Sequence, residues 1–195
     1  MAEIYIVRHG ITESNKKRIY MGRSQEGLAP EGIIQAGNLG KSLLPLGIKR
    51  IYSSPMQRAL ETASIIANTL KVPVEIERDL AEMELGIWTG LTEQEVSKKF
   101  PDEYRLWNTR PHDLFLADRE PLTEVQQRAL KAIAHIKEMN DGFPVLAVTH
   151  VAIVRCLILY YQSLNLNLYR TIPVPNVSVF RLQLDGDFGR ICRFL

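Results

Sequence analysis

Four short segments of this sequence predict strands, and two of them, residues 4–7 and 144–148, have the apolar pattern of buried strands. A continuous run, rather than an alternating one, is typical of a strand that is covered on both faces, as in a parallel sheet. The four predicted strands are residues 4–7, 50–53, 72–76 and 144–148. Near the end of the chain the pattern changes to partial alternation, which predicts an antiparallel hairpin. Its strands are residues 177–184 and 190–194, joined across 185–187.

Between these runs, apolar residues recur at helical spacing. The predicted helices are residues 30–44, 56–70, 92–99, 101–107, 121–140, and the segment after residue 150 as far as about 164. Before the second helix, Ser54 is a suitable N-cap and Pro55 is favoured at a first helical position. Strands that alternate with helices predict an α/β fold, here a three-layer sandwich with a mostly parallel central sheet flanked by helices. No repeat or linker divides residues 1–195, so we expect a single domain.

Composition narrows the class of protein without indicating its chemistry. The 195 residues are 46% hydrophobic and 24% charged, which is typical of a soluble globular protein. Lysine and arginine number 24 against 22 aspartates and glutamates, so the strong basic excess of a nucleic-acid-binding protein is absent. The longest apolar run, 151–161, contains Arg155 and is about half the length of a membrane span. We therefore predict a soluble, cytoplasmic protein with no nucleic-acid or membrane partner.

Histidine placement gives the first indication of chemistry. His9 and His150 each follow a predicted strand directly, and functional side chains gather at the carboxyl ends of strands in open α/β sheets. If the two strands are parallel neighbours, both imidazoles lie at one edge of the sheet; otherwise they are two unrelated surface histidines. Arg8 precedes His9, and Arg58 lies in the first helical turn after another strand. Two guanidinium groups would then reach the same edge.

Two histidines and two arginines can form either an anion pocket or a metal site. Guanidinium groups bind phosphate oxygens through two parallel hydrogen bonds, whereas they repel a divalent cation. The sequence has no His-x-x-x-His pair or carboxylate-rich companion segment, and its two cysteines do not have zinc-ligand spacing. The residues therefore favour a phosphate pocket over a metal centre.

A phosphate pocket of this kind needs a nucleophile and a proton donor. A neutral imidazole can attack phosphorus to form a phosphohistidine, and the neighbouring positive charges favour neutral His9 by depressing its pKa. The leaving oxygen needs a proton, and Glu82, in the loop after another predicted strand, is the best candidate acid. Glu84 is the alternative, and the residue types alone do not decide between them.

Five segments carry motifs in a recognisable order. Residues 8–15, Arg-His-Gly-Ile-Thr-Glu-Ser-Asn, match the signature Arg-His-Gly-x-Ser/Thr-x-x-Asn. The other four segments are residues 22–36, 52–59, 80–90 and 148–150. They are similar to a substrate loop, a Ser-Ser-Pro-x-x-Arg-Ala segment, a Leu-x-Glu…Gly-x-Trp-x-Gly loop and a second histidine strand. Together they resemble the histidine phosphatase superfamily, in its phosphoglycerate mutase-like branch, over nearly the whole chain.

The resemblance implies a role for each matching residue. His9 would be the phosphorylated nucleophile and Glu82, rather than Glu84, the proton donor. The phosphate clamp would consist of Arg8, Arg58 and His150. Further substrate contacts would come from Thr12, Asn15 and the backbone of Gly22. No metal or cofactor is expected.

The sequence departs from the family pattern in two places. Val151-Ala152 follow the second histidine, where the family commonly has glycine, and residues 118–121, Asp-Arg-Glu-Pro, replace its usual Gly-Gly-Glu-Ser. Neither change removes a catalytic group. Both alter segments near the substrate, so the resemblance does not identify which phosphomonoester is bound.

We therefore predict a metal-independent phosphatase of the histidine acid type that hydrolyses small phosphorylated metabolites through phospho-His9. The short stretch between Glu82 and His150 leaves little room for the insertions of a mutase, which favours hydrolysis. The alternatives are a cofactor-dependent phosphoglycerate mutase and a non-catalytic phospholigand-binding protein. A homodimer formed through the edge of the C-terminal hairpin is a further hypothesis.

Other polar and aromatic residues have ordinary structural interpretations. Arg128 and His135, on the long helix, are expected to be surface charges or members of a buried ion pair. Trp88 and Trp107 are expected to be packing anchors rather than ligand platforms.

Overall fold

The computed structural model describes residues 2–140, 142–186 and 188–195. The strands in these ranges are β1 (Ala2–Arg8), β2 (Arg50–Ser53), β3 (Val74–Ile76), β4 (Val145–Thr149), β5 (Val179–Asp185) and β6 (Phe188–Arg193). The α-helices are α1 (Glu13–Lys16), α2 (Pro30–Leu43), α3 (Gln57–Leu70), α4 (Glu93–Lys99), α5 (Pro101–Thr109), α6 (Leu122–Glu138) and α7 (Val151–Tyr161). None of the helices within the described ranges is long and apolar enough to cross a bilayer.

The strands form one sheet in the order β3-β2-β4-β1-β5-β6. The first four strands are parallel to one another, while β5 runs antiparallel to both β1 and β6. Arg8 of β1 lies beside Thr149 of β4, so these two strands end at the same level. The mostly parallel sheet and the C-terminal hairpin agree with the predictions. The predicted turn of that hairpin includes residue 187, which lies outside the described residues.

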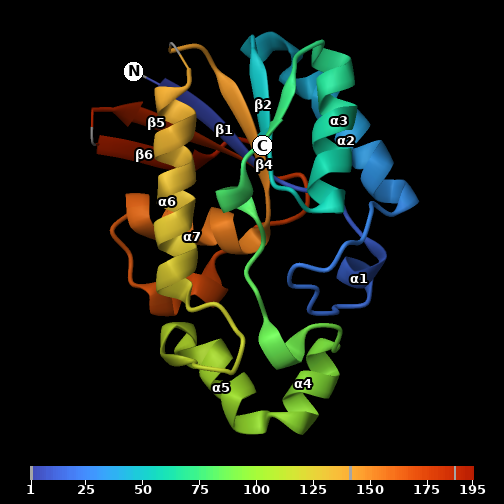
Figure 1. The fold of residues 1–195 in the computed structure, drawn as a ribbon, viewed down its shortest axis with the longest axis vertical. Coiled ribbons are helices and arrows are strands. Elements are labelled where there is room, and N and C mark those ends of the chain that lie inside the picture. Colours follow the sequence, from blue (N-terminus) through green and yellow to red (C-terminus); the bar gives the residue numbers. More distant parts are fainter. Residues whose placement is uncertain (1, 141, 187) are drawn as a thin grey trace.

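Helices cover both faces of the sheet, α2 and α3 on one face and α6 and α7 on the other (Figure 1). Because side chains alternate along a strand, β1 places Ile4 and Ile6 in the core beneath α6 and α7. Tyr5 and Val7 face the core beneath α2 and α3. All four side chains are buried, which explains why this strand is a continuous apolar run. The predicted three-layer α/β sandwich is confirmed.

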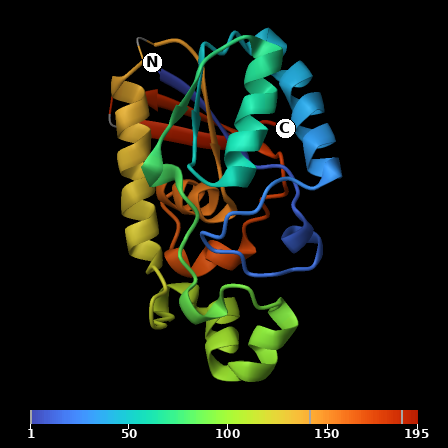
Figure 2. The same ribbon diagram turned by 45° about the vertical axis from the view of Figure 1, so that its right-hand side comes forward.

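The short helices α4 and α5 lie beyond the carboxyl edge of the parallel strands (Figure 2). An aromatic cluster holds this segment in place. The ring centroids of Trp88 and Trp107 are 6.2 Å apart, and those of Trp107 and Tyr169 are 5.3 Å apart. The Arg119 guanidinium lies over the Trp107 ring, 4.7 Å from its centroid. Both tryptophans are fully buried packing residues, as predicted.

The start of α3 and the end of α7 differ from the predictions for identifiable reasons. The N-cap of α3 is Met56, which makes no side-chain capping bond, so the assignment of Ser54 as N-cap is wrong. The Ser54 hydroxyl lies instead 2.6 Å from Nε2 of His150, a partner 96 positions away that local sequence does not reveal. α7 ends at Tyr161 rather than near residue 164. Its continuation is interrupted at Ser163, whose φ of 53° is left-handed and incompatible with a right-handed helix.

Candidate active site

Four polar side chains lie just past the carboxyl ends of four adjacent parallel strands. His9 follows β1, His150 follows β4, Arg58 lies at the start of α3 after β2, and Glu82 lies in the loop after β3. Parallel strands that are neighbours bring their carboxyl ends to one edge, so residues far apart in sequence meet there. The rings of His9 and His150 have centroids 5.1 Å apart, and both are buried. They are therefore not unrelated surface histidines.

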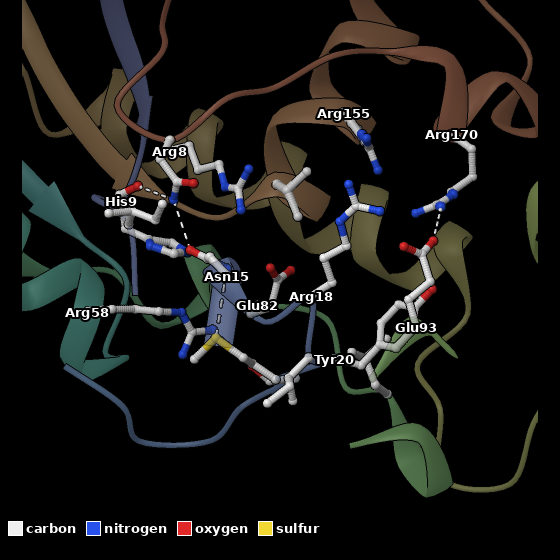
Figure 3. A pocket seen from close by; sticks show the side chains of 17 residues that line it. Arg8, His9, Asn15, Arg18, Tyr20, Arg58, Glu82, Glu93, Arg155 and Arg170 are labelled. Atoms are coloured by element: carbon white, nitrogen blue, oxygen red, sulfur yellow. Dashed lines mark hydrogen bonds and ion pairs between the residues drawn. The ribbon is translucent and has the colours of Figure 1, made fainter. Parts of the chain in front are cut away.

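A cavity of about 360 Å³ opens at this edge of the sheet (Figure 3). The candidate residues on its wall are Arg8, His9, Asn15, Gly22, Arg58 and Glu82. Gly22 has a φ of 51°, a left-handed conformation that glycine adopts without steric cost. Thr12 and His150 are fully buried and do not line the cavity. The Thr12 hydroxyl caps α1 by accepting a hydrogen bond from the amide of Asn15 at 3.2 Å.

His9 is held in one tautomer by its own backbone. Its Nδ1 lies 2.7 Å from the carbonyl oxygen of Gly10, and because a carbonyl can only accept, Nδ1 carries the proton. Burial, followed by the charges of Arg58 and Arg8, holds the pKa of His9 well below its usual value. The ring is therefore neutral, with its lone pair on Nε2. This is the state that nucleophilic attack requires.

Arg8 and Arg58 supply positive charge to the same cavity. Arg58 is only 1% exposed and donates to the carbonyl oxygens of Gly22 and Ser24, both at 2.9 Å. Arg8 donates to the carbonyl oxygen of Val174 at 2.7 Å. The Nε atoms of both arginines are buried without a hydrogen-bond partner among the described residues. Burial lowers both pKa values, that of Arg8 to about 10, which leaves Arg8 charged at neutral pH.

Glu82 is the buried carboxyl group of the cavity. Its Oε1 accepts a hydrogen bond from the amide of Met83 at 2.8 Å. Burial raises the pKa of Glu82, and the charge of Arg58 offsets part of this effect. A raised pKa keeps a proton on the carboxyl group at higher pH, which suits a proton donor. Glu84 does not line the cavity, and its carboxylate accepts a hydrogen bond from the neighbouring amide of Leu85.

The loop that carries Glu82 is held by Arg128 of α6. The guanidinium donates to the backbone carbonyl oxygens of Asp79, Ala81 and Glu82, at 2.8, 2.6 and 3.2 Å. It also pairs with both carboxylate oxygens of Glu120, at 2.6 and 2.9 Å, and the two side chains are only 14% and 11% exposed. A buried ion pair was one of the two interpretations that the sequence allowed for Arg128. Its contacts with the Glu82 loop join residues 46 to 49 positions apart, and no local pattern indicates them.

Glu120 belongs to the segment 118–121, in which the sequence departs from the family pattern. Besides Arg128, it pairs with Arg23 at 3.1 Å. Arg23 also donates to the carbonyl oxygen of Glu82 at 3.0 Å. None of residues 118–121 lines the cavity. This segment therefore supports the Glu82 loop rather than forming the cavity wall.

Asn176 is a further residue that the sequence patterns did not single out. Its Nδ2 donates to the carbonyl oxygen of His9 and to Oδ1 of Asn15, both at 3.0 Å. Oδ1 of Asn15 also accepts from the amide of Thr12 at 3.3 Å. The nearest partner of Asn15 Nδ2 is the sulfur of Met21 at 4.0 Å, a weak contact. The Asn15 side chain is thus oriented with its donor group available to an anion.

Three more arginines line the cavity without having been predicted as site residues: Arg18, Arg155 and Arg170. Arg155 lies five residues after His150, in the helix that follows the second histidine strand. Within the described ranges, no three His, Cys, Asp or Glu side chains are grouped so that they could hold a metal ion. The wall of the cavity is suited to an anion.

Known proteins resemble this chain in both sequence and structure. A family model described as the histidine phosphatase superfamily (branch 1) matches residues 4–194. Phosphoglycerate mutase-like protein 4 of Arabidopsis thaliana is 35% identical over 191 residues, which is 95% of this chain and 81% of that protein. Phosphoserine phosphatase 1 of Hydrogenobacter thermophilus is 28% identical over 185 residues, 95% and 88% of the two chains. The solved structure of Bacillus stearothermophilus YhfR has a TM-score of 0.93 and 30% identity, covering 99% of this chain and 96% of that one.

Proposed function

The chain belongs to the histidine phosphatase superfamily, and from this membership and the cavity geometry we propose that it is a metal-independent phosphatase of small phosphomonoesters. We assign this activity, of the histidine acid type, to residues 1–195 as a single domain. One observation carries the proposal: a neutral His9 in a fixed tautomer shares a cavity with the half-buried Arg8, the buried Arg58 and the buried Glu82.

In the first step, Nε2 of His9 attacks the phosphorus atom. The new P–N bond forms as the P–O bond to the leaving group breaks, and Arg8 and Arg58 stabilise the charge on the transferring oxygens. Glu82 gives its proton to the leaving oxygen, so the alcohol departs neutral. The products of this step are phospho-His9 and an ionised Glu82.

In the second step, water attacks the phosphorus of phospho-His9. The Glu82 carboxylate takes a proton from that water as the P–N bond breaks. Inorganic phosphate leaves, and His9 and Glu82 return to their starting states. Division into two displacements replaces one difficult reaction with two easier ones.

Other residues around His9 and Glu82 make supporting contacts. Asn15 donates from Nδ2, and the backbone of Gly22 lies on the cavity wall. Thr12 acts by orienting Asn15 through the α1 cap. His150 would belong to the phosphate clamp and act through its Nδ1 atom, which is buried without a hydrogen-bond partner among the described residues. We propose that its Nε2 contact with Ser54 fixes the ring beside His9.

The names of the relatives include both a phosphoserine phosphatase and a phosphoglycerate mutase-like protein, so the reaction must be distinguished by experiment. The short stretch between Glu82 and His150 favours hydrolysis. A mutase would convert 3-phosphoglycerate to its isomer faster than it releases phosphate and would depend on 2,3-bisphosphoglycerate. A non-catalytic binding protein would bind phosphate without turnover of any ester.

The test compares the wild type with His9→Ala on p-nitrophenyl phosphate. The wild type should release phosphate, and 32P-labelled substrate should leave a label on the protein that is stable to base and labile to acid, as expected of phosphohistidine. His9→Ala should show neither. His112→Ala is the matched control, because His112 does not line the cavity. Undiminished phosphatase activity in His9→Ala would overturn the mechanism.

A further inference from the structure

The cavity wall carries more positive charge than a single phosphate group requires. Five arginines line it against two glutamates. Two of these arginines lie at the end that holds His9. The other three lie at the opposite end, beyond Glu82: Arg18, Arg155 and Arg170 (Figure 3). The positive charge of the cavity therefore extends beyond the two arginines beside His9.

At the outer end, one arginine is already neutralised and two are not. Arg170 pairs with Glu93 at 3.3 Å and donates to Oδ1 of Asn108 at 3.1 Å. Neither Arg18 nor Arg155 takes part in an ion pair with any carboxylate in the described part of the chain. In Figure 3 their guanidinium groups extend toward the same part of the cavity. Their charges are available to a ligand.

Arg155 is held in position before any ligand binds. Its Nε donates to the carbonyl oxygen of Ile172 at 2.9 Å, and the guanidinium lies over the Tyr169 ring, 5.0 Å from its centroid. Its two terminal nitrogens make no hydrogen bond with the described residues. A guanidinium fixed through Nε presents these nitrogens as a planar pair, which matches the two oxygens of a carboxylate or phosphate.

Arg18 occupies a backbone position that favours glycine. Its φ is 54°, in the left-handed region that most side chains avoid. The loop is fixed there, because the Arg18 amide donates to Asn15 and the Arg18 carbonyl accepts from the amide of Glu93. Unfavourable backbone conformations at a ligand cavity often support function. An arginine at this position places a charged side chain on the wall of the cavity.

The positions on α7 limit the size of the ligand. His150 is the N-cap of this helix, and both Val151 and Arg155 line the cavity. Residues four apart lie on the same helix face, about 5–6 Å apart at Cβ. A ligand with its phosphate beside His9 would therefore pass the apolar Val151 side chain before its far end reached Arg155. A linker of a few uncharged atoms fits this spacing.

We propose that Arg18 and Arg155 form a second anion subsite. The substrate would then be a small phosphomonoester whose leaving group carries a carboxylate or a second phosphate. This inference rests on the proposed phosphatase function: the phosphate that is cleaved lies between Arg8 and Arg58, and the second anion lies between Arg18 and Arg155. Val151, at the position where the family commonly has glycine, contacts the linker.

The test measures kcat/KM for pairs of esters that differ in one charged group. O-phosphoserine and O-phosphoethanolamine differ by a carboxylate, while fructose 1,6-bisphosphate and fructose 6-phosphate differ by a second phosphate. At least one pair should show a preference of about 10-fold or more for the member with the extra anion, the value of one charge-assisted hydrogen bond. The pair that shows it identifies the second anion as a carboxylate or a phosphate.

The same pairs are then measured with arginine variants. Arg18→Gln and Arg155→Gln should bring the preference toward unity, because only the member with the extra anion loses a contact. Arg155→Lys should retain part of the preference, since it keeps the charge but not the planar pair of donors. Arg105→Gln is the matched control: Arg105 is 78% exposed, does not line the cavity and should keep the full preference. Arg18 is also exposed, so its variant keeps the test valid if Arg155→Gln does not fold.

Each other outcome has a distinct meaning. Equal kcat/KM values within both pairs in the wild type overturn the subsite and leave the phosphatase proposal standing. Equal losses on both members of a pair in the arginine variants overturn it as well, because they indicate general electrostatic attraction. If none of these esters nor p-nitrophenyl phosphate is hydrolysed, the phosphatase proposal fails and the subsite fails with it.

Discussion

The Nδ1–H of His9 donates a hydrogen bond to the carbonyl oxygen of Gly10, the next residue, at 2.7 Å. The Gly10 amide in turn donates to the hydroxyl of Thr62 at 3.0 Å, and that hydroxyl donates to the carbonyl oxygen of Arg58 at 2.7 Å. These three bonds connect the tautomer of His9 to the first turn of α3. The proposed nucleophile and the backbone that carries Arg58 are therefore linked by the same network.

Glu82→Gln removes the proposed proton donor while keeping the shape of the side chain. For an alkyl phosphate, whose leaving oxygen needs a proton, kcat/KM should fall by about 10²–10⁴-fold. The loss in the first step should be smaller for p-nitrophenyl phosphate, because nitrophenolate leaves without a proton. Glutamine cannot take a proton from water in the second step, so phospho-His9 should accumulate. Rapid mixing of Glu82→Gln with p-nitrophenyl phosphate should therefore show a burst of nitrophenolate. Glu84→Gln should behave as the wild type; equal losses on both esters without a burst would exclude Glu82 as the donor.

His9 and His150 should make the fold less stable in mild acid. Burial, followed by the charge of Arg58, holds both pKa values well below the unfolded value of about 6.5. As the pH falls below 6.5, the unfolded chain binds protons that the folded chain does not. The free energy of unfolding then decreases by up to about 1.4 kcal/mol per pH unit for each histidine. Above pH 6.5 both states are neutral at these positions and this loss is absent.

Chemical denaturation between pH 7.5 and 5 measures this effect. His9→Gln and His150→Gln should each reduce the slope of unfolding free energy against pH by about 1.4 kcal/mol per unit in the acid range. The raised pKa of Glu82 acts in the opposite direction, because the folded state takes up that proton first as the pH falls. Glu82 is present in all three proteins, so its contribution cancels in the comparison. An unchanged slope in both variants would contradict the assignment of neutral, buried rings.

The fold could be predicted where a local pattern determines the structure. Residues 50–53 were predicted as a strand and form β2 with those bounds. Residues 4–7 form the buried part of β1, because a short apolar run buried on both faces has few alternatives. The start of α3 was misassigned for the opposite reason. Ser54 is a good N-cap by residue type, but its hydroxyl contacts His150, the residue after β4, which is close to it only in space.

The same distinction applies to the site. His9 could be located because it follows a strand, and parallel strands deliver such residues to one edge. Glu82 was chosen over Glu84 only because it matches a family motif. Arg128 could not be located, because its role depends on α6 packing against the loop of residues 79–82. Arg18 is similar: nothing in its local sequence indicates a left-handed backbone beside a cavity. Roles that depend on contacts between distant elements require the structure.

Arg128→Lys and Arg128→Met separate the two effects of this residue on Glu82. Lysine cannot bond three carbonyl oxygens and Glu120 together, so the loop should shift and kcat should fall by about 10-fold or more. Methionine also removes a charge that lowers the pKa of Glu82, so the alkaline limb of the pH profile should move to higher pH. Lysine keeps the charge and should leave that limb in place. Lys131→Met, also on α6 but exposed, is the control; a limb that moves equally in both Arg128 variants would contradict this role.

Gly32→Ala and Gly37→Ala, both in α2, should change stability in opposite directions. A Cβ on Gly32 would overlap the carbonyl oxygen of Ile11, in the loop between His9 and Asn15, whereas a Cβ on Gly37 would have no neighbour within 4 Å. Gly37→Ala should stabilise the protein by about 0.5–1 kcal/mol through helix propensity. Gly32→Ala should destabilise it by about 1–3 kcal/mol and lower kcat/KM, because the loop that carries His9 must move. Denaturation curves measure the changes in stability, and kinetics on p-nitrophenyl phosphate measure the change in kcat/KM. Equal stabilisation by the two alanines would show that α2 does not constrain this loop.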